Sequence, residues 1–289
     1  MKVFLISICT ALLLSVPGTA IAKKDQPQHA DIKVSYNYHK IFVRGSDGVI
    51  EKDIDMLLVA NTQTSKFYSP RANMIDSLHS TPKGKATYDK MFDASINEYM
   101  KTRDRSSMIS VSYPIYMYVF KSLSQATTTV YDNVSLNEFE YYSEPYAEMQ
   151  WEVKDDSTKT IMGYECMMAE TDYHGRHWTV WFTPEIPIGD GPWKFCGLPG
   201  LILEASEDSG QHTFTANGIE KSNMEITPIY NPDKYTKSDR LSMLKSDRAY
   251  RNNPSAIINA TLGQNLMPAE MPNAEAEKYD FLETDYHEK

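Results

Sequence analysis

Alternation of apolar and polar residues with a period of two restricts the fold of this chain more than any other feature of its sequence. In residues 32–38, Ile32, Val34, Tyr36 and Tyr38 alternate with polar residues. A period of two places successive side chains on opposite faces, so this stretch predicts a β-strand with one face toward a core. The same alternation recurs in residues 149–154, 177–182 and 212–218, while more uniformly apolar stretches that predict central strands lie at 53–60 and 115–120.

Helical periodicity is limited to two stretches of the sequence. Residues 86–101 place apolar residues three and four apart, which predicts an amphipathic helix. A weaker helix is predicted over 238–251, whereas the proline-containing residues 69–85 predict a loop with one short helix at most. We therefore expect a mainly β (α+β) protein: a curved antiparallel sheet of roughly ten strands, with one or two helices packed on it.

The first residues predict export from the cytoplasm. Lys2 precedes an apolar run over residues 3–16, and Ala20-Ile21-Ala22 fits the small-x-small cleavage pattern of a signal peptide. No later run approaches the about 20 apolar residues that a spanning helix needs, so no membrane span is predicted. We expect a periplasmic or extracellular location. The predicted organisation is a signal peptide over 1–22, a flexible start over 23–30, a single antiparallel β domain over 31–265 and an acidic, loosely held tail over 266–289.

Charge and cysteine content narrow the classes of partner and of cross-link. The chain has 29 Lys and Arg against 39 Asp and Glu, and this acidic balance argues against nucleic acid as a partner. Of three cysteines, Cys9 lies in the predicted signal peptide. In an exported chain the remaining pair, Cys166 and Cys196, predicts one disulfide, and the alternative is two thiols of which one is reactive.

The sequence Gly197-Leu198-Pro199-Gly200-Leu201 predicts a tight turn between two strands, WKFC at 193–196 and LILEAS at 201–206. Proline and glycine stand at the two central positions that a type II turn favours, so we expect Gly200 to adopt a left-handed conformation. Gly197 would allow a close approach or a bulge.

Four apolar residues crowd around this turn, namely Leu198, Leu201, Ile202 and Leu203. Apolar residues on both sides of a turn imply that it is not surrounded by water. The turn either seals the end of the core or lines a groove for an apolar ligand or partner. We favour the first alternative for Ile202 and Leu203, which continue into a strand, and leave both open for Leu198 and Leu201.

The hexapeptide Gly197–Ile202 reads GLPGLI, and the stretch 159–203 around it resembles the GLPGLI family of exported Bacteroidota proteins. Residues 55–69, an apolar strand ending in Ser-Lys-Phe-Tyr-Ser, are similar to a second block of that family. Genes of that family often lie near those of TonB-dependent outer-membrane transporters, so the resemblance implies an envelope setting and no particular reaction. The hairpin at 160–183 also resembles, at the level of fold, the LolA-like periplasmic half-barrels.

Motifs that would indicate a catalytic mechanism are missing from the sequence. It contains no HExxH helix, GxSxG elbow, glycine-rich phosphate loop or EF-hand loop. We therefore predict no catalytic residue and no cofactor. His174 and His177 flank a Gly-Arg turn and are weak metal candidates, with an ordinary polar hairpin tip as the favoured interpretation. A role for Cys196 as a nucleophile is a further, weaker alternative.

The candidate ligand- or partner-binding residues surround the same block of sequence. They are Arg176, Trp181, Trp193, Phe195, Leu198 and Leu201. Trp combines a large apolar face with one donor and suits a binding platform, although burial in the core is the favoured interpretation for each Trp. For Arg176, the two alternatives are a solvated side chain and an ion pair with Glu185 or Asp190. The predicted function is that of a non-enzymatic binding or carrier protein of the cell envelope, for an unknown apolar ligand, peptide or envelope protein. One version of this role is an accessory to TonB-dependent outer-membrane transport. The alternative is a metal-handling protein or an unrecognised enzyme of the cell envelope.

Overall fold

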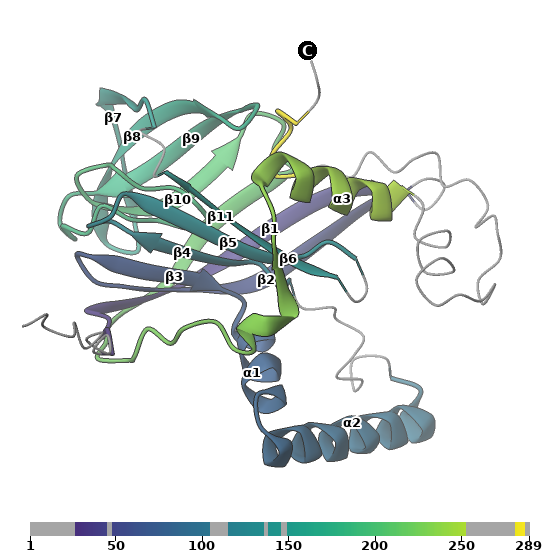
Figure 1. The fold of residues 1–289 in the computed structure, drawn as a ribbon. Helices are drawn as coiled ribbons and strands as arrows, with labels where there is room; N and C mark the ends of the chain where they lie inside the picture. Colours follow the sequence, from purple (N-terminus) through teal and green to yellow (C-terminus); the bar gives the residue numbers. More distant parts are fainter. Residues whose placement is uncertain are drawn as a thin grey trace, which may run out of the picture.

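One twelve-stranded mixed sheet organises the computed structural model, which describes residues 27–44, 48–104, 115–135, 138–145, 149–252 and 281–286 (Figure 1). The predicted signal peptide, residues 1–22, lies outside the described residues. The strands are β1 Ile32–Arg44, β2 Gly48–Ala60, β3 Thr64–Tyr68, β4 Tyr118–Ser122, β5 Thr127–Asn133, β6 Phe139–Pro145, β7 Glu152–Ile161, β8 Tyr164–Tyr173, β9 Arg176–Thr183, β10 Leu201–Glu207, β11 His212–Lys221 and β12 Tyr235–Lys237.

Two antiparallel meanders make up the sheet. The strand order is β12-β6-β5-β4-β3-β2-β1-β11-β10-β9-β8-β7, so β1 to β6 form one half, β7 to β11 form the other, and the β1–β11 pair joins them. Among the described strands, β12 alone pairs in parallel, with β6. The sheet is curved and open, with β12 and β7 at its two edges (Figure 1). The predicted mainly β fold with a curved sheet is therefore confirmed, and the parallel β12 is the departure from an antiparallel sheet.

Alternation along the strands separates two buried faces. On β3, Phe67 points into the main core, where its ring packs edge-on against Tyr36 with centroids 6.1 Å apart. Its neighbours Lys66 and Tyr68 point to the opposite face. We call the face of Phe67 the inner face. The chain between β9 and β10, residues 184–200, packs on this inner face and supplies Trp193 and Phe195 to the core.

A buried lysine lies on the outer face. Lys66 is 1% exposed, and its ammonium group donates to Asn73 Oδ1 at 2.8 Å and Thr227 Oγ1 at 3.1 Å. The same nitrogen lies 4.6 Å from the ring centre of Tyr68 and 5.3 Å from that of Tyr118. Burial lowers the pKa of Lys66 to about 8, because the charged form loses its hydration.

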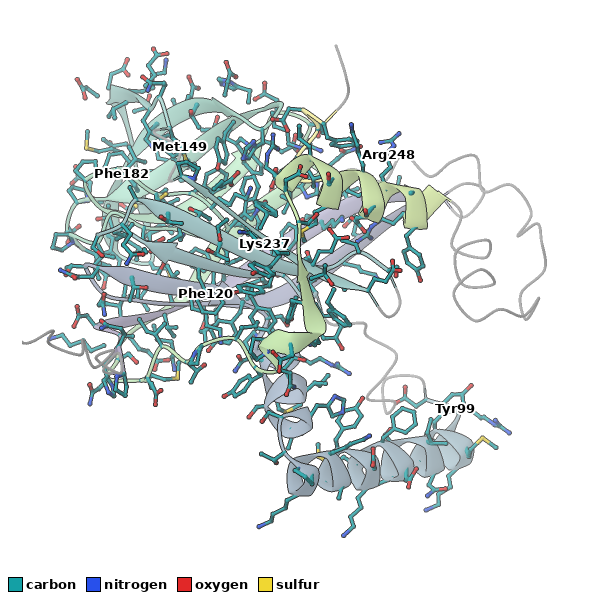
Figure 2. The ribbon with its side chains drawn as sticks, in the orientation of Figure 1. Tyr99, Phe120, Met149, Phe182, Lys237 and Arg248 are labelled. Carbon is teal, nitrogen blue, oxygen red and sulfur yellow. The ribbon has the colours of Figure 1, made fainter. Side chains whose placement is uncertain are left out.

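Three helices accompany the sheet in the described part of the chain: α1 Pro70–His79, α2 Pro82–Thr102 and α3 Arg240–Asn252. The helices predicted over 86–101 and 238–251 are confirmed as α2 and α3. α2 does not pack on the sheet as expected: it contacts α1 and projects away from the strands (Figure 1), and Ser95 is its only buried residue. Side chains, Tyr99 among them, surround it on several sides in Figure 2. No described helix combines the length and apolar character needed to cross a membrane.

Lys121 on β4 explains why the predicted strand at 193–196 does not form. Its buried ammonium donates to the carbonyl oxygens of Gly191 at 2.9 Å, Trp193 at 3.1 Å and Phe195 at 3.1 Å, and it pairs with the equally buried Asp190. In a strand, carbonyls two residues apart point the same way but lie about 6.6 Å from one another, so three of them cannot converge on one ammonium group. Residues 190–196 therefore form a turn closed by a single bridge between Asp190 and Cys196.

Gly200 does not have the predicted left-handed conformation. Positive φ angles occur at Gly197 instead, with φ 93°, and not at Gly200. Gly200 is buried, and a Cβ added there would lie 2.1 Å from the carbonyl oxygen of Thr183. Close approach of the backbone of β9 therefore excludes a side chain at this position. Pro199 beside it is exposed.

No disulfide joins Cys166 and Cys196, so the predicted cross-link is wrong. The Cys166 thiol lies on β8 and donates to the carbonyl of Tyr164 at 3.6 Å. The Cys196 thiol lies in the turn after β9 and donates to the carbonyl of Lys194 at 3.1 Å. Both side chains are buried and bonded locally, and burial raises the pKa of Cys166. An even number of cysteines says nothing about whether two strands bring them together.

Candidate functional site

Most of the side chains predicted to bind a ligand lie in the core. Trp193 is 1% exposed, Phe195 0%, Leu198 4% and Leu201 0%. The turn around Pro199 and Gly200 therefore seals the core, which decides between the two alternatives for Leu198 and Leu201. Trp181 is half-buried and lies under the ammonium group of Lys159, 4.3 Å from its ring centre.

Arg176 begins β9 and contacts groups that the sequence did not suggest. Its Nη1 donates to Glu207 Oε2 at 3.0 Å, and its Nε and Nη2 donate to the carbonyl oxygen of Phe281 at 3.1 and 2.6 Å. Backbone N–H groups of Ser209 and His212 hold the Glu207 carboxylate in place. Arg176 thus links β9, β10 and the C-terminal residues, in place of the ion pair with Glu185 or Asp190 that was one of its two predicted alternatives.

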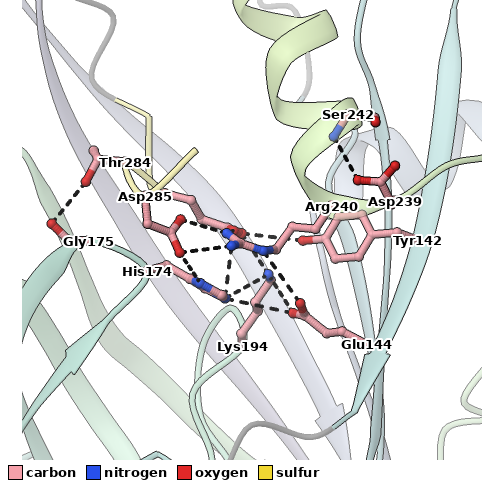
Figure 3. Close-up of polar contacts among 11 residues, drawn as sticks. Tyr142, Glu144, His174, Gly175, Lys194, Asp239, Arg240, Ser242, Thr284 and Asp285 are labelled. Atoms are coloured by element: carbon pink, nitrogen blue, oxygen red, sulfur yellow. Dashed lines mark hydrogen bonds and ion pairs between the residues drawn. The ribbon is translucent and has the colours of Figure 1, made fainter. Parts of the chain in front are cut away.

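A group of charged side chains surrounds His174, in the turn between β8 and β9 (Figure 3). Lys194 pairs with Glu144 at 2.8 Å and with Glu283 at 2.7 Å. Arg240, at the start of α3, pairs with Glu283 at 2.6 Å and with both oxygens of Asp285 at 2.7 and 2.9 Å. We call this group the ion cluster; its members are Glu144, His174, Lys194, Arg240, Glu283 and Asp285.

The ion cluster stabilises the charged form of its carboxylates. Burial alone would raise the pKa of Glu144, but the hydrogen bond from His174 and the ammonium of Lys194 lower it to about 2. For Asp285, burial is again outweighed, here by hydrogen bonds and charge from Arg240, and the pKa falls to about 2. Charges of Lys194 and His174 hold the pKa of the buried Glu283 below its usual range.

A metal ion is a poor fit to the same side chains. Ligand atoms of His174, Glu283 and Asp285 lie within 4.8 Å of one another, which is close enough for three metal ligands. Lys194 and Arg240 already donate to these carboxylates, however. A divalent cation would have to displace these two positive groups or sit beside them, at a large electrostatic cost. The arrangement is an ion-pair network.

His177, the second predicted metal candidate, does not join this network. Its ring pairs with Asp172 at 2.8 Å on the exposed part of the hairpin. His174 and Gly175 form the two-residue turn of that hairpin, with φ angles of 51° and 84°. The turn therefore points His174 toward the ion cluster while His177 stays on the surface.

A pocket of about 440 Å³ opens elsewhere, where the start of β1 and the end of β11 meet the chain that follows β9. Its apolar lining comes from Ile32, Tyr164, Ile186, Pro187, Ile188 and Ile219. Its charged lining comes from Asp31, Glu185, Glu220 and Lys221. Ile186 and Pro187 lie within residues 159–203, the block that resembles the GLPGLI family. None of the six predicted binding residues lines this pocket.

Sequence reasoning missed Lys121, Lys194 and the tail residues Glu283 and Asp285. A signal was present for both lysines. Lys194 stands between Trp193 and Phe195, and Lys121 follows an uninterrupted apolar run. A lone cation in apolar sequence predicts a buried charge that needs a partner. Residues 281–286 had no such signal, since their acidic composition suggested a loosely held tail, yet Glu283 is only 5% exposed.

Comparisons with known proteins are informative for a short segment only. Residues 172–204 match the profile of a Bacteroidota-associated family described as a protein of unknown function, Porph_ging. No curated protein sequence matches significantly. Two crystal structures of PNGF-II are similar to this chain at 14% identity and a TM-score of 0.46. Each match covers 76% of this chain but only about a third of PNGF-II, 34% in one crystal form and 33% in the other. An uncharacterised conserved protein from Thermus thermophilus is similar at 4% identity and a TM-score of 0.34, over 72% of this chain and 91% of that one.

Proposed function

We propose that this chain is a non-enzymatic binding protein of the cell envelope that holds an apolar ligand carrying a positive charge, such as an apolar peptide with a basic residue. The pocket beside Ile186 and Pro187 is the observation that supports this proposal. Its volume of about 440 Å³ lies in the range of about 300–1,000 Å³ that small-ligand sites occupy. Such a volume holds one or two apolar side chains of a peptide.

The lining of the pocket is the basis for the proposed class of ligand. Ile32 and Ile188 are buried in the floor, whereas Asp31, Glu185 and Glu220 lie exposed at the rim. The rim thus carries three carboxylates, of which Glu220 already pairs with Lys33 at 2.9 Å, and the ammonium of Lys221, so Asp31 and Glu185 are the carboxylates that face a ligand. An apolar group favours the floor, and a positive charge beside it favours the rim.

Export and membership of the GLPGLI family remain part of the proposal. The signal-peptide pattern in residues 1–22 and the two blocks that resemble the family support a periplasmic or extracellular setting. In that setting, the protein would serve as an accessory to a TonB-dependent outer-membrane transport system by binding peptides. The pairing of Lys121, Lys194 and Arg240 with carboxylates supports a binding role for these charges over a catalytic one.

Binding of two short synthetic peptides tests the proposal. We expect acetyl-Ile-Leu-Lys-amide to bind saturably in calorimetry and acetyl-Ile-Leu-Glu-amide to bind much more weakly. Glu185→Gln should weaken binding of the lysine peptide about fivefold, because an exposed ion pair contributes up to about 1 kcal/mol. Glu165→Gln is the matched control, since Glu165 is an exposed carboxylate nearby that does not line the pocket.

Three results would overturn this assignment. Equal affinity for both peptides would remove the charge selection, and no binding of either at millimolar concentration would remove the pocket as a site. Stoichiometric metal in protein purified without a tag would favour the metal-handling alternative.

A further inference from the structure

We propose that the surface holding residues 281–286 is a second binding site, specific for acidic peptides, and that these residues are its resident intramolecular ligand. We call residues 281–286 the tail segment. The surface that contacts it, the tail groove, consists of His174, Gly175, Arg176, Lys194, Arg240 and Arg248. This site is separate from the pocket beside Ile186 and takes a ligand of opposite charge.

The tail groove holds the segment through three hydrogen bonds to backbone groups that any peptide offers and one from the side chain of Thr284. Arg176 donates twice to the carbonyl oxygen of Phe281, from Nε at 3.1 Å and Nη2 at 2.6 Å. The backbone N–H of Thr284 donates to the carbonyl of His174 at 2.9 Å, and its hydroxyl donates to the carbonyl of Gly175 at 3.0 Å. Backbone contacts of this kind fix the register of a peptide ligand.

Selection for acidic side chains comes from the ion cluster. Glu283 accepts from Lys194 at 2.7 Å and from Arg240 at 2.6 Å, and Asp285 receives both guanidinium nitrogens of Arg240. A guanidinium that faces a carboxylate with two nitrogens recognises it by shape as well as charge. The groove therefore reads two carboxylates spaced two residues apart.

Aromatic residues close both ends of the tail segment. Tyr286 is 6% exposed, its hydroxyl accepts from Arg248, and the Arg248 guanidinium lies 5.5 Å from its ring centre. The rings of Phe281 and Tyr286 meet edge to face with centroids 5.8 Å apart. The ligand class is thus a bent peptide with one aromatic residue on each side of an acidic pair.

The tail groove keeps much of its shape through contacts that do not involve the tail segment. Glu207 holds Arg176 at 3.0 Å, and Glu144 holds Lys194 at 2.8 Å. Loss of the tail segment would take the Glu283 and Asp285 carboxylates away from this surface and leave its basic side chains in place. A basic groove on a chain of net charge −10 attracts an acidic peptide, whether that peptide comes from the tail segment or from another protein.

Cleavage of the folded chain tests whether the tail segment behaves as a ligand. A specific protease site is placed within residues 253–280, the full chain is folded intact, and it is then cut. A fluorescent peptide of residues 278–289 is added, and anisotropy reports its exchange with the cut tail segment. We expect saturable, salt-sensitive binding that weakens at least tenfold when the peptide carries Glu283→Gln and Asp285→Asn.

Two glycines provide a matched pair of variants. A Cβ on Gly175 would lie 2.4 Å from Thr284 Oγ1, whereas a Cβ on Gly163, at the neighbouring hairpin turn, meets nothing within 4 Å. Their φ angles are 84° and 88°, so alanine strains both turns to the same extent. We expect Gly175→Ala to reduce peptide affinity at least tenfold and Gly163→Ala to leave it unchanged.

The proposal fails if the labelled peptide does not bind the cut chain, or if it binds equally well after loss of both carboxylates. It also fails if the two glycine variants behave alike. Unfolding of the cut chain on release of the tail segment, seen by circular dichroism, would assign the segment to the structural core and overturn its role as a ligand. Binding at the Ile186 pocket is measured independently, so failure here leaves that proposal intact.

Discussion

Replacement of Lys121 by methionine is the change that tests most directly how the inner face is held together. Lys121 and Asp190 are both 0% exposed at their side chains, and the same ammonium serves three backbone carbonyls. Methionine fills a similar volume and removes only the charge and the donors. The variant leaves the Asp190 carboxylate buried without its cation.

The expected cost follows from that uncompensated charge. Removing one partner of a buried ion pair costs about 3–5 kcal/mol, and the carbonyls left without a donor add to it. We therefore expect Lys121→Met to lower the free energy of unfolding by at least about 4 kcal/mol. For a domain of this size that corresponds to a fall in melting temperature of about 8–16 °C.

Denaturant unfolding followed by tryptophan fluorescence measures this effect, because Trp193 lies beside Lys121. Lys159→Met is the control, since Lys159 forms a half-exposed ion pair with Glu204 at 2.7 Å and its loss should cost less than about 1 kcal/mol. Asp190→Asn combined with Lys121→Met should restore part of the stability. Equal effects of Lys121→Met and Lys159→Met would refute the reasoning.

Three further predictions concern stability. The pKa values of Glu144 and Asp285 are lowered to about 2, so their contribution to the free energy of unfolding is complete above about pH 4.5 and is lost as the pH falls toward 2. In thermal melts across this range, the melting temperature of Asp285→Asn should depend less steeply on pH than that of the wild type. Parallel pH dependences would contradict the prediction. Gly200→Ala should lower the free energy of unfolding by at least about 3 kcal/mol, because its Cβ would meet the backbone carbonyl of Thr183. Gly197→Ala should cost about 1–2 kcal/mol from its positive φ alone. Denaturant unfolding measures both, and the reverse order would count against the close approach of the β9 backbone to Gly200. Because the pKa of Lys66 is about 8 in the folded state, the folded chain releases this proton at a lower pH than the unfolded chain does. The free energy of unfolding of the wild type should therefore rise between about pH 8 and 9.5 relative to that of Lys66→Met. A difference in free energy of unfolding that stays constant over this range would disprove the lowered pKa.

The sheet and two helices were predictable because their signals are local. Alternation over 32–38 and 212–218 marks β1 and β11, and spacing of three and four marks α2. The strand expected at 193–196 failed for a non-local reason. Lys121 lies on β4, 70 residues before Gly191 in the chain, and nothing in the sequence near 193–196 shows that its ammonium will collect those carbonyls.

The candidate site was predictable only in its individual residues. Arg176 was singled out, but its partners Glu207 and Phe281 lie 31 and 105 residues away, beyond any local pattern. The disulfide was inferred from the number of cysteines and the expected compartment, neither of which carries geometry. Apolar residues around Gly200 indicated burial correctly, because hydrophobicity depends on the residue itself and not on which partner it meets.

The position of β1 between β2 and β11 has a consequence for the growing polypeptide. β2 follows β1 directly, but β11 comes from residues 212–221, so one edge of the 13-residue β1 has no neighbour until most of the chain has been made. At about 5–20 residues per second, this interval is on the order of 10 s. A long, unpaired strand edge is a template for pairing with another chain. Chains that stop before β11 should therefore aggregate through β1, and a chaperone that covers this edge would decide the yield of the complete protein.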